Sequence, residues 1–126
     1  IILTNRELDE NRFKAFNNQA ETWVIQPFRE GKSDKAIYIR LPELQNNAQN
    51  ILELLYQRFV FSLIVEGGRD TLNMFIESGM WDEARVIGGA KTFGKGLEAP
   101  ELPLAKLIRT ENHGEDTLRI YMNEGL

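Results

Sequence analysis

The chain of 126 residues contains no cysteine and a single histidine, His113. The absence of cysteine excludes disulfides and any metal site built on thiolates. A zinc site would need carboxylates for nearly every ligand, so we expect no bound metal. A chain without cysteine also fits a reducing compartment, and we expect a cytoplasmic protein.

Long apolar runs and clustered positive charge are also missing. No run approaches the roughly 20 apolar residues that span a bilayer, and no basic region precedes an apolar stretch as in a signal peptide. Lysine and arginine number 15 against 19 acidic residues, which gives a net charge of −4. Without a basic cluster, a nucleic-acid-binding surface is not expected. We therefore expect neither a membrane nor a nucleic acid as a partner.

The length and the first residues bear on domain organisation. A chain of 126 residues fits one domain, and such a domain buries roughly 65% of the surface of its unfolded chain. The segment Ile1-Ile2-Leu3-Thr4-Asn5 reads as a strand that enters a turn with no lead-in and no initiator methionine. We interpret residues 1–126 as a single partial domain, cut from a longer protein upstream of Ile1.

Short apolar segments alternate with amphipathic helical patterns along the chain. The patterns predict strands at 1–3, 22–25, 36–39, 61–65, 81–87, 104–110 and 117–122, and helices at 42–59 and 69–78. Residues 26–35 and 88–103 are expected to be loops, and residues 112–116 the turn of a hairpin. This order predicts an α/β protein with a mixed sheet, covered by helices and ending in a β-hairpin.

The segment from Ser62 to Ile76 carries the clearest functional signal. It reads as a buried strand, then Glu66, then Gly67 and Gly68, then a helix. Open α/β sheets bind ligands where strands end, and a helix N-terminus favours anions there. One glycine would adopt a positive φ, and the other would leave no side chain between backbone and ligand. The alternative is a strand-to-helix turn that merely prefers glycine.

The residues around this turn extend the candidate site. Glu66 would point into the same crevice, and a carboxylate that ends an apolar strand is costly to bury without a partner. Arg69 could pair with a phosphate or remain solvated. Asp70 suits the positive end of the helix as a cap, although its charge would repel a phosphate. Thr71 and Asn73 could donate to an anion or face water.

Three other motifs are expected to be structural or peripheral. Asp82 and Glu83 are adjacent, and neighbours on a strand point to opposite faces, so we do not expect them to share a site. The segment Lys91 to Gly96 lacks the glycine–lysine spacing of a phosphate-binding loop, and a flexible rim of an active site is expected instead. His113 is expected at an exposed hairpin tip.

The segment SLIVEGGRDTLNMFIESGMWDEARV, residues 62–86, resembles the C-terminal reductase domain of the bifunctional riboflavin-biosynthesis deaminase/reductase. That family has Glu-Gly-Gly after an apolar strand and a Gly-Leu-x-Asp-Glu motif, in place of which this chain has residues 79–83. Residues 93–100 are similar to the loop that follows in the family, and Ile2-Leu3-Thr4-Asn5 to a strand and turn halfway through its domain.

This resemblance implies a dihydrofolate-reductase-like fold, with helices flanking a mixed sheet. It implies NADPH-dependent reduction of the ribosyl group of 5-amino-6-(5-phosphoribosylamino)uracil to the ribitylamino product. By position, Glu66 matches the glutamate that contacts the pyrimidine substrate. The residues that match the NADPH-binding turn and helix are Gly67, Gly68, Arg69, Asp70, Thr71, Leu72, Asn73 and Met74. No side chain is identified as the proton donor, so the catalytic residues stay unknown.

The family's zinc deaminase domain and the first part of its reductase domain have no counterpart in this sequence. Hydride transfer requires cofactor and substrate to be oriented together, so we expect this chain alone to be inactive or nearly so. Two alternatives stay open. One is another dihydrofolate-reductase-like NADPH reductase, acting on a pterin or pyrimidine. The other is a non-catalytic assembly fragment, because missing strands would expose sheet edges and family members form homo-oligomers such as homodimers.

Overall fold

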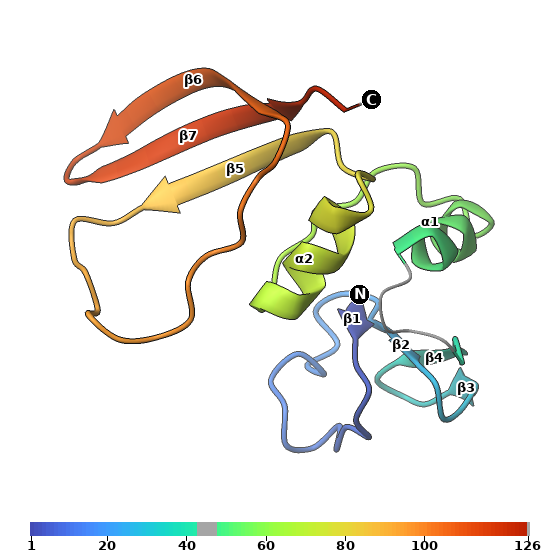
Figure 1. The fold of residues 1–126 in the computed structure, drawn as a ribbon. Helices are drawn as coiled ribbons and strands as arrows, with labels where there is room; N and C mark the ends of the chain where they lie inside the picture. The colour runs from blue at the N-terminus through green and yellow to red at the C-terminus, as the bar shows by residue number, and fades with distance from the viewer. Residues whose placement is uncertain (43–47, 126) are drawn as a thin grey trace. The chain divides into compact units, whose positions relative to one another are not determined.

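The computed structural model describes residues 1–42 and 48–125. Contacts divide the chain into two compact units, unit 1 at Ile1–Phe61 and unit 2 at Ser62–Leu126. Within these described residues, each unit contains one sheet and one helix (Figure 1). Both units combine helix with strand, which agrees with the predicted α/β class.

Unit 1 contains a four-stranded sheet in the order β1-β2-β4-β3. Strands β1 (Ile2–Leu3), β2 (Trp23–Gln26) and β4 (Ile37–Arg40) are parallel and confirm three predicted strands. The sequence did not predict β3 (Gly31–Lys32), which pairs antiparallel with β4 inside the expected loop. Its two residues are exposed, so no apolar alternation marked it as a strand.

The sheet of unit 1 buries side chains on both faces. Val24 and Tyr38 are cross-strand neighbours, and they pack with Phe16 and Ala36 in one core cluster. Because side chains alternate along a strand, Ile25 points to the opposite face, where its exposure is 0%. Leu8 and Ile2 also pack against the cluster, so the polar segment between β1 and β2 is anchored by its apolar residues.

Helix α1 spans Ala48–Tyr56 and buries Ala48, Ile51 and Leu55, the face that the apolar spacing predicted. The predicted first residue, Pro42, lies in a bend outside the helix, and residues 43–47 lie outside the described residues. The helix ends earlier than expected, because Phe59 adopts the left-handed conformation (φ 63°). The Phe59 N–H donates to the Tyr56 carbonyl (2.9 Å) and the Val60 N–H to the Leu55 carbonyl (3.0 Å). This pair of bonds is the Schellman motif that closes helix C-termini.

The predicted buried strand at residues 61–65 is wrong for this structure. The segment lies outside both sheets, and Phe61 and Ile64 are 72% and 84% exposed. An apolar run becomes a strand only when a neighbouring strand pairs with its backbone groups. No strand within residues 1–42 and 48–125 pairs with this segment, so its hydrophobicity alone was a misleading signal.

Unit 2 contains α2 (Arg69–Glu77) and a three-stranded antiparallel sheet in the order β5-β7-β6. Its strands are β5 (Glu83–Gly88), β6 (Ala105–His113) and β7 (Asp116–Asn123), and a long loop joins β5 to β6 (Figure 1). The predicted helix, terminal hairpin and loop are confirmed. The hairpin turn is shorter than predicted, because pairing continues to His113 and Asp116.

Two local features shape the hairpin. Gly114 opens the two-residue turn with φ 64°, as tight hairpin turns favour. The register shifts between Leu107 and Arg109, so Ile108 is an extra residue of β6 without a partner on β7. Such a bulge bends the strand and locally increases its twist.

No helix in the described part of the chain is long and apolar enough to cross a membrane.

Candidate functional site

The turn before α2 has the geometry that the two glycines predicted. Gly67 adopts φ 149°, a conformation that side chains disfavour. Gly68 is the N-cap residue with extended backbone (φ −73°, ψ 166°), and α2 begins at Arg69. A Cβ atom at Gly68 would meet no heavy atom within 4 Å, whereas one at Gly67 would lie 3.8 Å from Thr71 Cβ. The backbone at Gly68 therefore borders open space.

The N-terminus of α2 has no side-chain cap. The expected capping role of Asp70 is wrong, because Gly68 occupies the cap position and Asp70 lies two residues inside the helix. Asp70 contributes only its negative charge to the first turn. An uncapped helix start leaves backbone N–H groups without intrahelical partners, and these groups can receive an anion.

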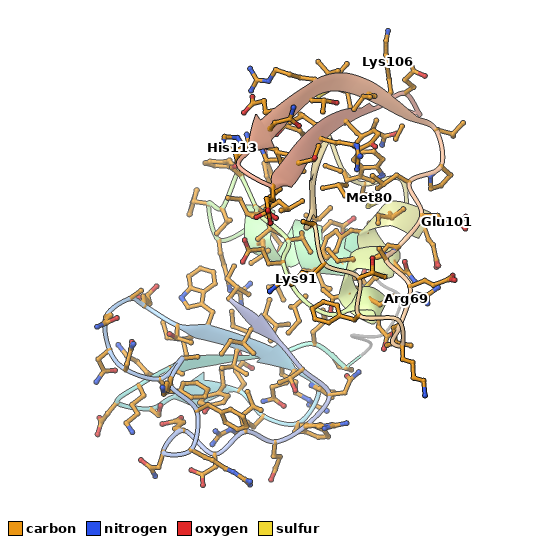
Figure 2. All side chains as sticks on the ribbon, turned by 90° about the vertical axis from the view of Figure 1, so that its left-hand side faces the viewer. Arg69, Met80, Lys91, Glu101, Lys106 and His113 are labelled. Carbon is orange, nitrogen blue, oxygen red and sulfur yellow. The ribbon has the colours of Figure 1, made fainter. Side chains whose placement is uncertain are left out.

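The other predicted site residues differ in exposure. Glu66, Arg69 and Asp70 are exposed, and Arg69 lies in the first turn of α2 (Figure 2). The half-buried members of the set are Thr71, Leu72, Asn73 and Met74. The expectation that Glu66 ends a buried strand is corrected here, because residues 61–65 form no strand and Glu66 is exposed. The roles of all these residues in binding stay predictions.

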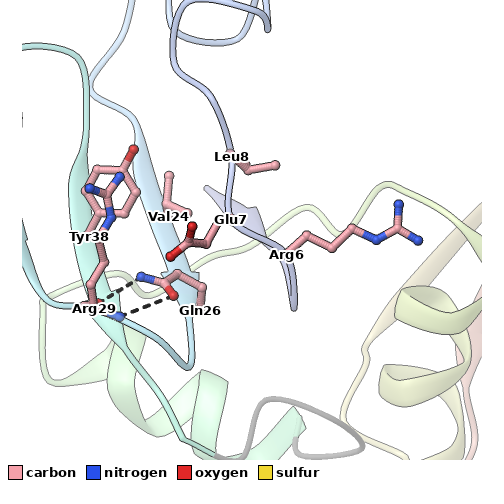
Figure 3. Close-up of a pocket in the computed structure, with 7 residues that line it drawn as sticks. All are labelled: Arg6, Glu7, Leu8, Val24, Gln26, Arg29 and Tyr38. Carbon is pink, nitrogen blue, oxygen red and sulfur yellow. Dashed lines mark hydrogen bonds between the residues drawn. The ribbon is translucent and has the colours of Figure 1, made fainter.

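A pocket in unit 1 was not predicted. It has a volume of about 160 Å³ and is lined by Arg6, Glu7, Leu8, Val24, Gln26, Arg29 and Tyr38 (Figure 3). Gln26 ends β2 and Arg6 follows β1, so the pocket reaches the carboxyl ends of two parallel strands, where α/β sheets place ligands. The ends of the predicted strands could have indicated this pocket. The pocket was missed because residues 26–35 have only the polar composition of a loop.

Hydrogen bonds hold Gln26 and the backbone of Arg29 in place. Gln26 is 3% exposed. Its amide donates to the Arg29 carbonyl (2.9 Å), and its side-chain oxygen accepts from the N–H groups of Phe28 (2.6 Å) and Arg29 (3.3 Å). The Arg29 guanidinium lies 3.5 Å from the centroid of the Tyr38 ring, a cation–π contact. In Figure 3, Arg6 points away from this group.

Glu10 accepts hydrogen bonds beside the pocket. The Tyr38 hydroxyl and the Ser33 hydroxyl (2.7 Å) both donate to its Oε1 atom. The bonds from Tyr38 and then Ser33 lower the pKa of Glu10. Burial, followed by the bond to Glu10, raises the pKa of Tyr38. At neutral pH, Glu10 is therefore a carboxylate and Tyr38 a neutral donor.

Asp82 and Glu83 do not form a pair. Glu83 binds Arg85 (2.6 Å), whereas the Asp82 carbonyl accepts from the Asn123 N–H (3.0 Å). The Asn123 side-chain amide donates to the carbonyls of Gly79 (2.9 Å) and Trp81 (2.8 Å). The Asn123 side chain therefore holds this corner, and the Asp82 group that accepts there is its backbone carbonyl rather than the expected carboxylate.

The remaining motifs are on the surface. His113 is exposed at the end of β6, opposite the end that carries Lys106 (Figure 2), and its Nε2 lies 3.2 Å from Glu111 Oε2. Residues 91–96 are exposed and lie in the loop between β5 and β6. No group of three metal-ligating side chains occurs in the described ranges.

The fold is similar to that of a solved riboflavin biosynthesis reductase. It matches the structure of Rib7 from Saccharomyces cerevisiae with a TM-score of 0.73 over 96% of this chain and 67% of that chain. The identity is 16%, so this likeness shows the fold alone. It confirms the predicted dihydrofolate-reductase-like α/β fold.

A family model described as the RibD C-terminal domain matches residues 1–118, and the chain belongs to this family. The riboflavin biosynthesis protein RibD of Aquifex aeolicus (strain VF5) is 33% identical over 78 residues. The match covers 56% of this chain and 22% of that protein. The chain thus spans about a fifth of the length of this curated relative.

Proposed function

We propose that this chain forms part of an NADPH-dependent reductase of riboflavin biosynthesis. The substrate would be 5-amino-6-(5-phosphoribosylamino)uracil, whose ribosyl group is reduced to the ribitylamino product. Membership of the RibD C-terminal family supports this function, and the open, uncapped turn at Gly67-Gly68 is the structural observation that carries it. Residues 1–126 remain, in this proposal, a single partial domain of a longer cytoplasmic protein.

The turn fits the phosphate groups of NADPH. The uncapped N–H groups at the start of α2 favour an anion, and Gly68 has no side chain to block it. Thr71 in the first turn of α2 and Asn73 at the start of the second would donate to the same group, and Arg69 would add a positive charge. When bound, NADPH supplies the hydride, while the residues of this chain bind and orient it.

Glu66 would contact the pyrimidine of the substrate. Glu66 is an exposed carboxylate next to Gly67, and a carboxylate accepts hydrogen bonds from pyrimidine N–H groups. The unit 1 pocket offers Arg29, whose guanidinium is held over Tyr38 with about half of its side chain exposed (54%). A guanidinium held at the ends of parallel strands suits the phosphate of a phosphorylated sugar.

A matched set of glycine variants tests the cofactor site. Gly68→Ala adds a methyl group in open space, so we expect unchanged thermal stability and NADPH affinity reduced about tenfold or more. Gly67→Ala forces a side chain into φ 149° and should cost about 1–3 kcal/mol of stability. Fluorescence titration with NADPH and thermal melts measure the two effects.

The control is Gly89→Ala, where an added Cβ makes an ordinary 3.6 Å contact with Asp116. It should change neither NADPH affinity nor stability by much. Full NADPH affinity in Gly68→Ala would show that the turn is only structural. Absence of any NADPH binding by the unmodified chain would overturn the assignment of the turn.

The two alternatives make different predictions. A reductase of another pterin or pyrimidine would bind NADPH but show no affinity for ribosylaminopyrimidine phosphates. An assembly module would bind neither and form homo-oligomers, which the exposed apolar residues Phe61, Ile64 and Ile87 would favour. Sedimentation analysis reports the assembly. We expect a homo-oligomer that alone has little or no reductase activity.

A further inference from the structure

Glu10 lies beside the unit 1 pocket and contacts two residues that line it. Its Oε1 atom accepts from the hydroxyl of Tyr38 and lies 3.9 Å from Nη2 of Arg29. Ser33 donates to the same atom at 2.7 Å. The Glu10 carboxylate therefore contacts two residues that line the pocket, Tyr38 and Arg29.

The same residue fastens the segment that forms another wall of the pocket. Residues 4–22 connect β1 to β2 and include the lining residues Arg6, Glu7 and Leu8. Besides the bonds of the Glu10 carboxylate, Lys35 donates to the Glu10 carbonyl (3.5 Å) and to Asn11 Oδ1 (2.8 Å). These contacts bridge at least 23 positions of sequence, so they fix a segment that has no helix or strand of its own.

The orientations of Tyr38 and Arg29 depend on each other. The Tyr38 ring is 4% exposed, its hydroxyl binds Glu10, and Arg29 covers its face at 3.5 Å. The ring holds the guanidinium by cation–π attraction, and Glu10 adds attraction from the side. Loss of the Glu10 oxygens would release the tyrosine hydroxyl, the arginine and the segment together.

We propose that Glu10 is the positioning residue of this pocket, holding Arg29 over Tyr38 and residues 4–22 in place so that the pocket binds a phosphate-bearing sugar. The inference rests on the proposed function, whose substrate carries a sugar phosphate. The charged groups that face Glu10 are Arg29 and Lys35, and Glu7 and Arg6 also line the pocket.

An alternative role for Glu10 predicts the opposite effect of its removal on phosphate affinity. As a negative charge beside Arg29, it would repel an anionic ligand, and removing it would strengthen phosphate binding. The positioning role predicts that shape matters more than charge, because a glutamine oxygen still accepts from Tyr38 and Ser33. Comparison of Glu10→Gln with Glu10→Ala therefore separates the two roles.

The experiment titrates the full chain with ribose 5-phosphate by calorimetry at pH 7. We expect Glu10→Gln to bind within about threefold of the unmodified chain and Glu10→Ala about tenfold more weakly. The control Asp34→Asn removes a neighbouring exposed acid and should leave the affinity unchanged. Tyr38→Phe keeps the ring, loses the bond to Glu10, and should weaken binding about threefold, so it serves if Glu10→Ala does not fold.

Hydrogen exchange gives a readout that needs no ligand. Glu10→Ala should accelerate exchange of amides in residues 5–16 while α1 keeps its protection. Equal or tighter binding in both Glu10 variants would overturn the positioning role. If the unmodified chain fails to bind ribose 5-phosphate while it binds NADPH, the pocket is no phosphate site and the inference fails, but the cofactor assignment stands.

Discussion

The two units of this chain achieve their structure by different means. Of the eleven buried apolar residues in the described part of the chain, nine lie in unit 1, and only Phe75 and Ile120 lie in unit 2. Unit 2 instead carries an antiparallel ladder that is interrupted at Ile108, and it holds nine of the fifteen exposed large apolar residues of the described chain. The contrast indicates that burial stabilises unit 1, whereas backbone pairing and corner hydrogen bonds define unit 2.

The exposed apolar residues of unit 2 are the second lesson of the comparison. Phe93 and Leu97 in the loop before β6 are 94% and 85% exposed. Single exposed apolar residues are ordinary, but several together mark surfaces that contact something else. We therefore expect unit 2 to make more contacts with other chains or with ligands than unit 1 does.

Core truncation should show the largest difference between the units. Ile51→Ala removes a side chain with 0% exposure in unit 1, and we expect a loss of about 2–5 kcal/mol in the free energy of unfolding. The matched variant Ile87→Ala changes a residue that is 74% exposed in unit 2 and should stay within about 0.5 kcal/mol. Urea unfolding followed by circular dichroism measures both. Similar losses of unfolding free energy in the two variants would contradict the contrast between the units.

The corner at Asn123 should give the next largest effect. Its side chain donates to the carbonyls of Gly79 and Trp81 and accepts from the Gly125 N–H (2.9 Å). Asn123→Ala removes these bonds, and we expect about 1–3 kcal/mol of destabilisation. Asn112→Ala on the neighbouring strand β6 is the control. Exchange of the β5 amides should accelerate only in Asn123→Ala, and unchanged protection there would remove Asn123 from its proposed role in unit 2.

The smallest effect is a pH dependence confined to unit 1. The pKa of Glu10 is lowered from 4.5, so its contribution is complete above the unfolded value and is lost as the pH falls through the folded pKa. The pKa of Tyr38 is raised from 10.0, so its contribution is complete below that value and is lost as the pH rises through the folded pKa. The exposed ion pairs of unit 2 should matter little.

Hydrogen exchange of residues 5–16 as a function of pH tests this prediction. Protection should be greatest between the two ordinary pKa values and decline on either side. Glu10→Gln should flatten the acidic decline and leave the alkaline one. An acidic decline of equal size in the variant would assign it to another group.

The sequence predicted the helix and the hairpin of unit 2 well, although unit 2 buries few apolar residues. Helix α2 follows from the spacing of Leu72, Phe75 and Ile76, and its end from Gly79, which adopts φ 71°. The hairpin follows from alternation around a turn with Gly114. These are local signals, set by residues within a few positions of one another.

Several features that the sequence missed depend on distant partners. Glu10 meets Tyr38 across 28 positions, and no local pattern marks either residue. The pocket combines residues from β2, β4 and two connecting segments. The segment 61–65 has the composition of a strand, but strand formation depends on a partner that composition does not reveal. The candidate turn at Gly67 was predictable because two adjacent glycines define it.

The extra residue Ile108 limits how β6 can be extended by another chain. β6 is an edge strand of nine residues, and such edges invite uncontrolled strand addition and fibre growth. An incoming strand would lose its register at Ile108, so neither side of the interruption offers a long straight template. The interruption at Ile108 thus makes β6 a poor template for one long added strand.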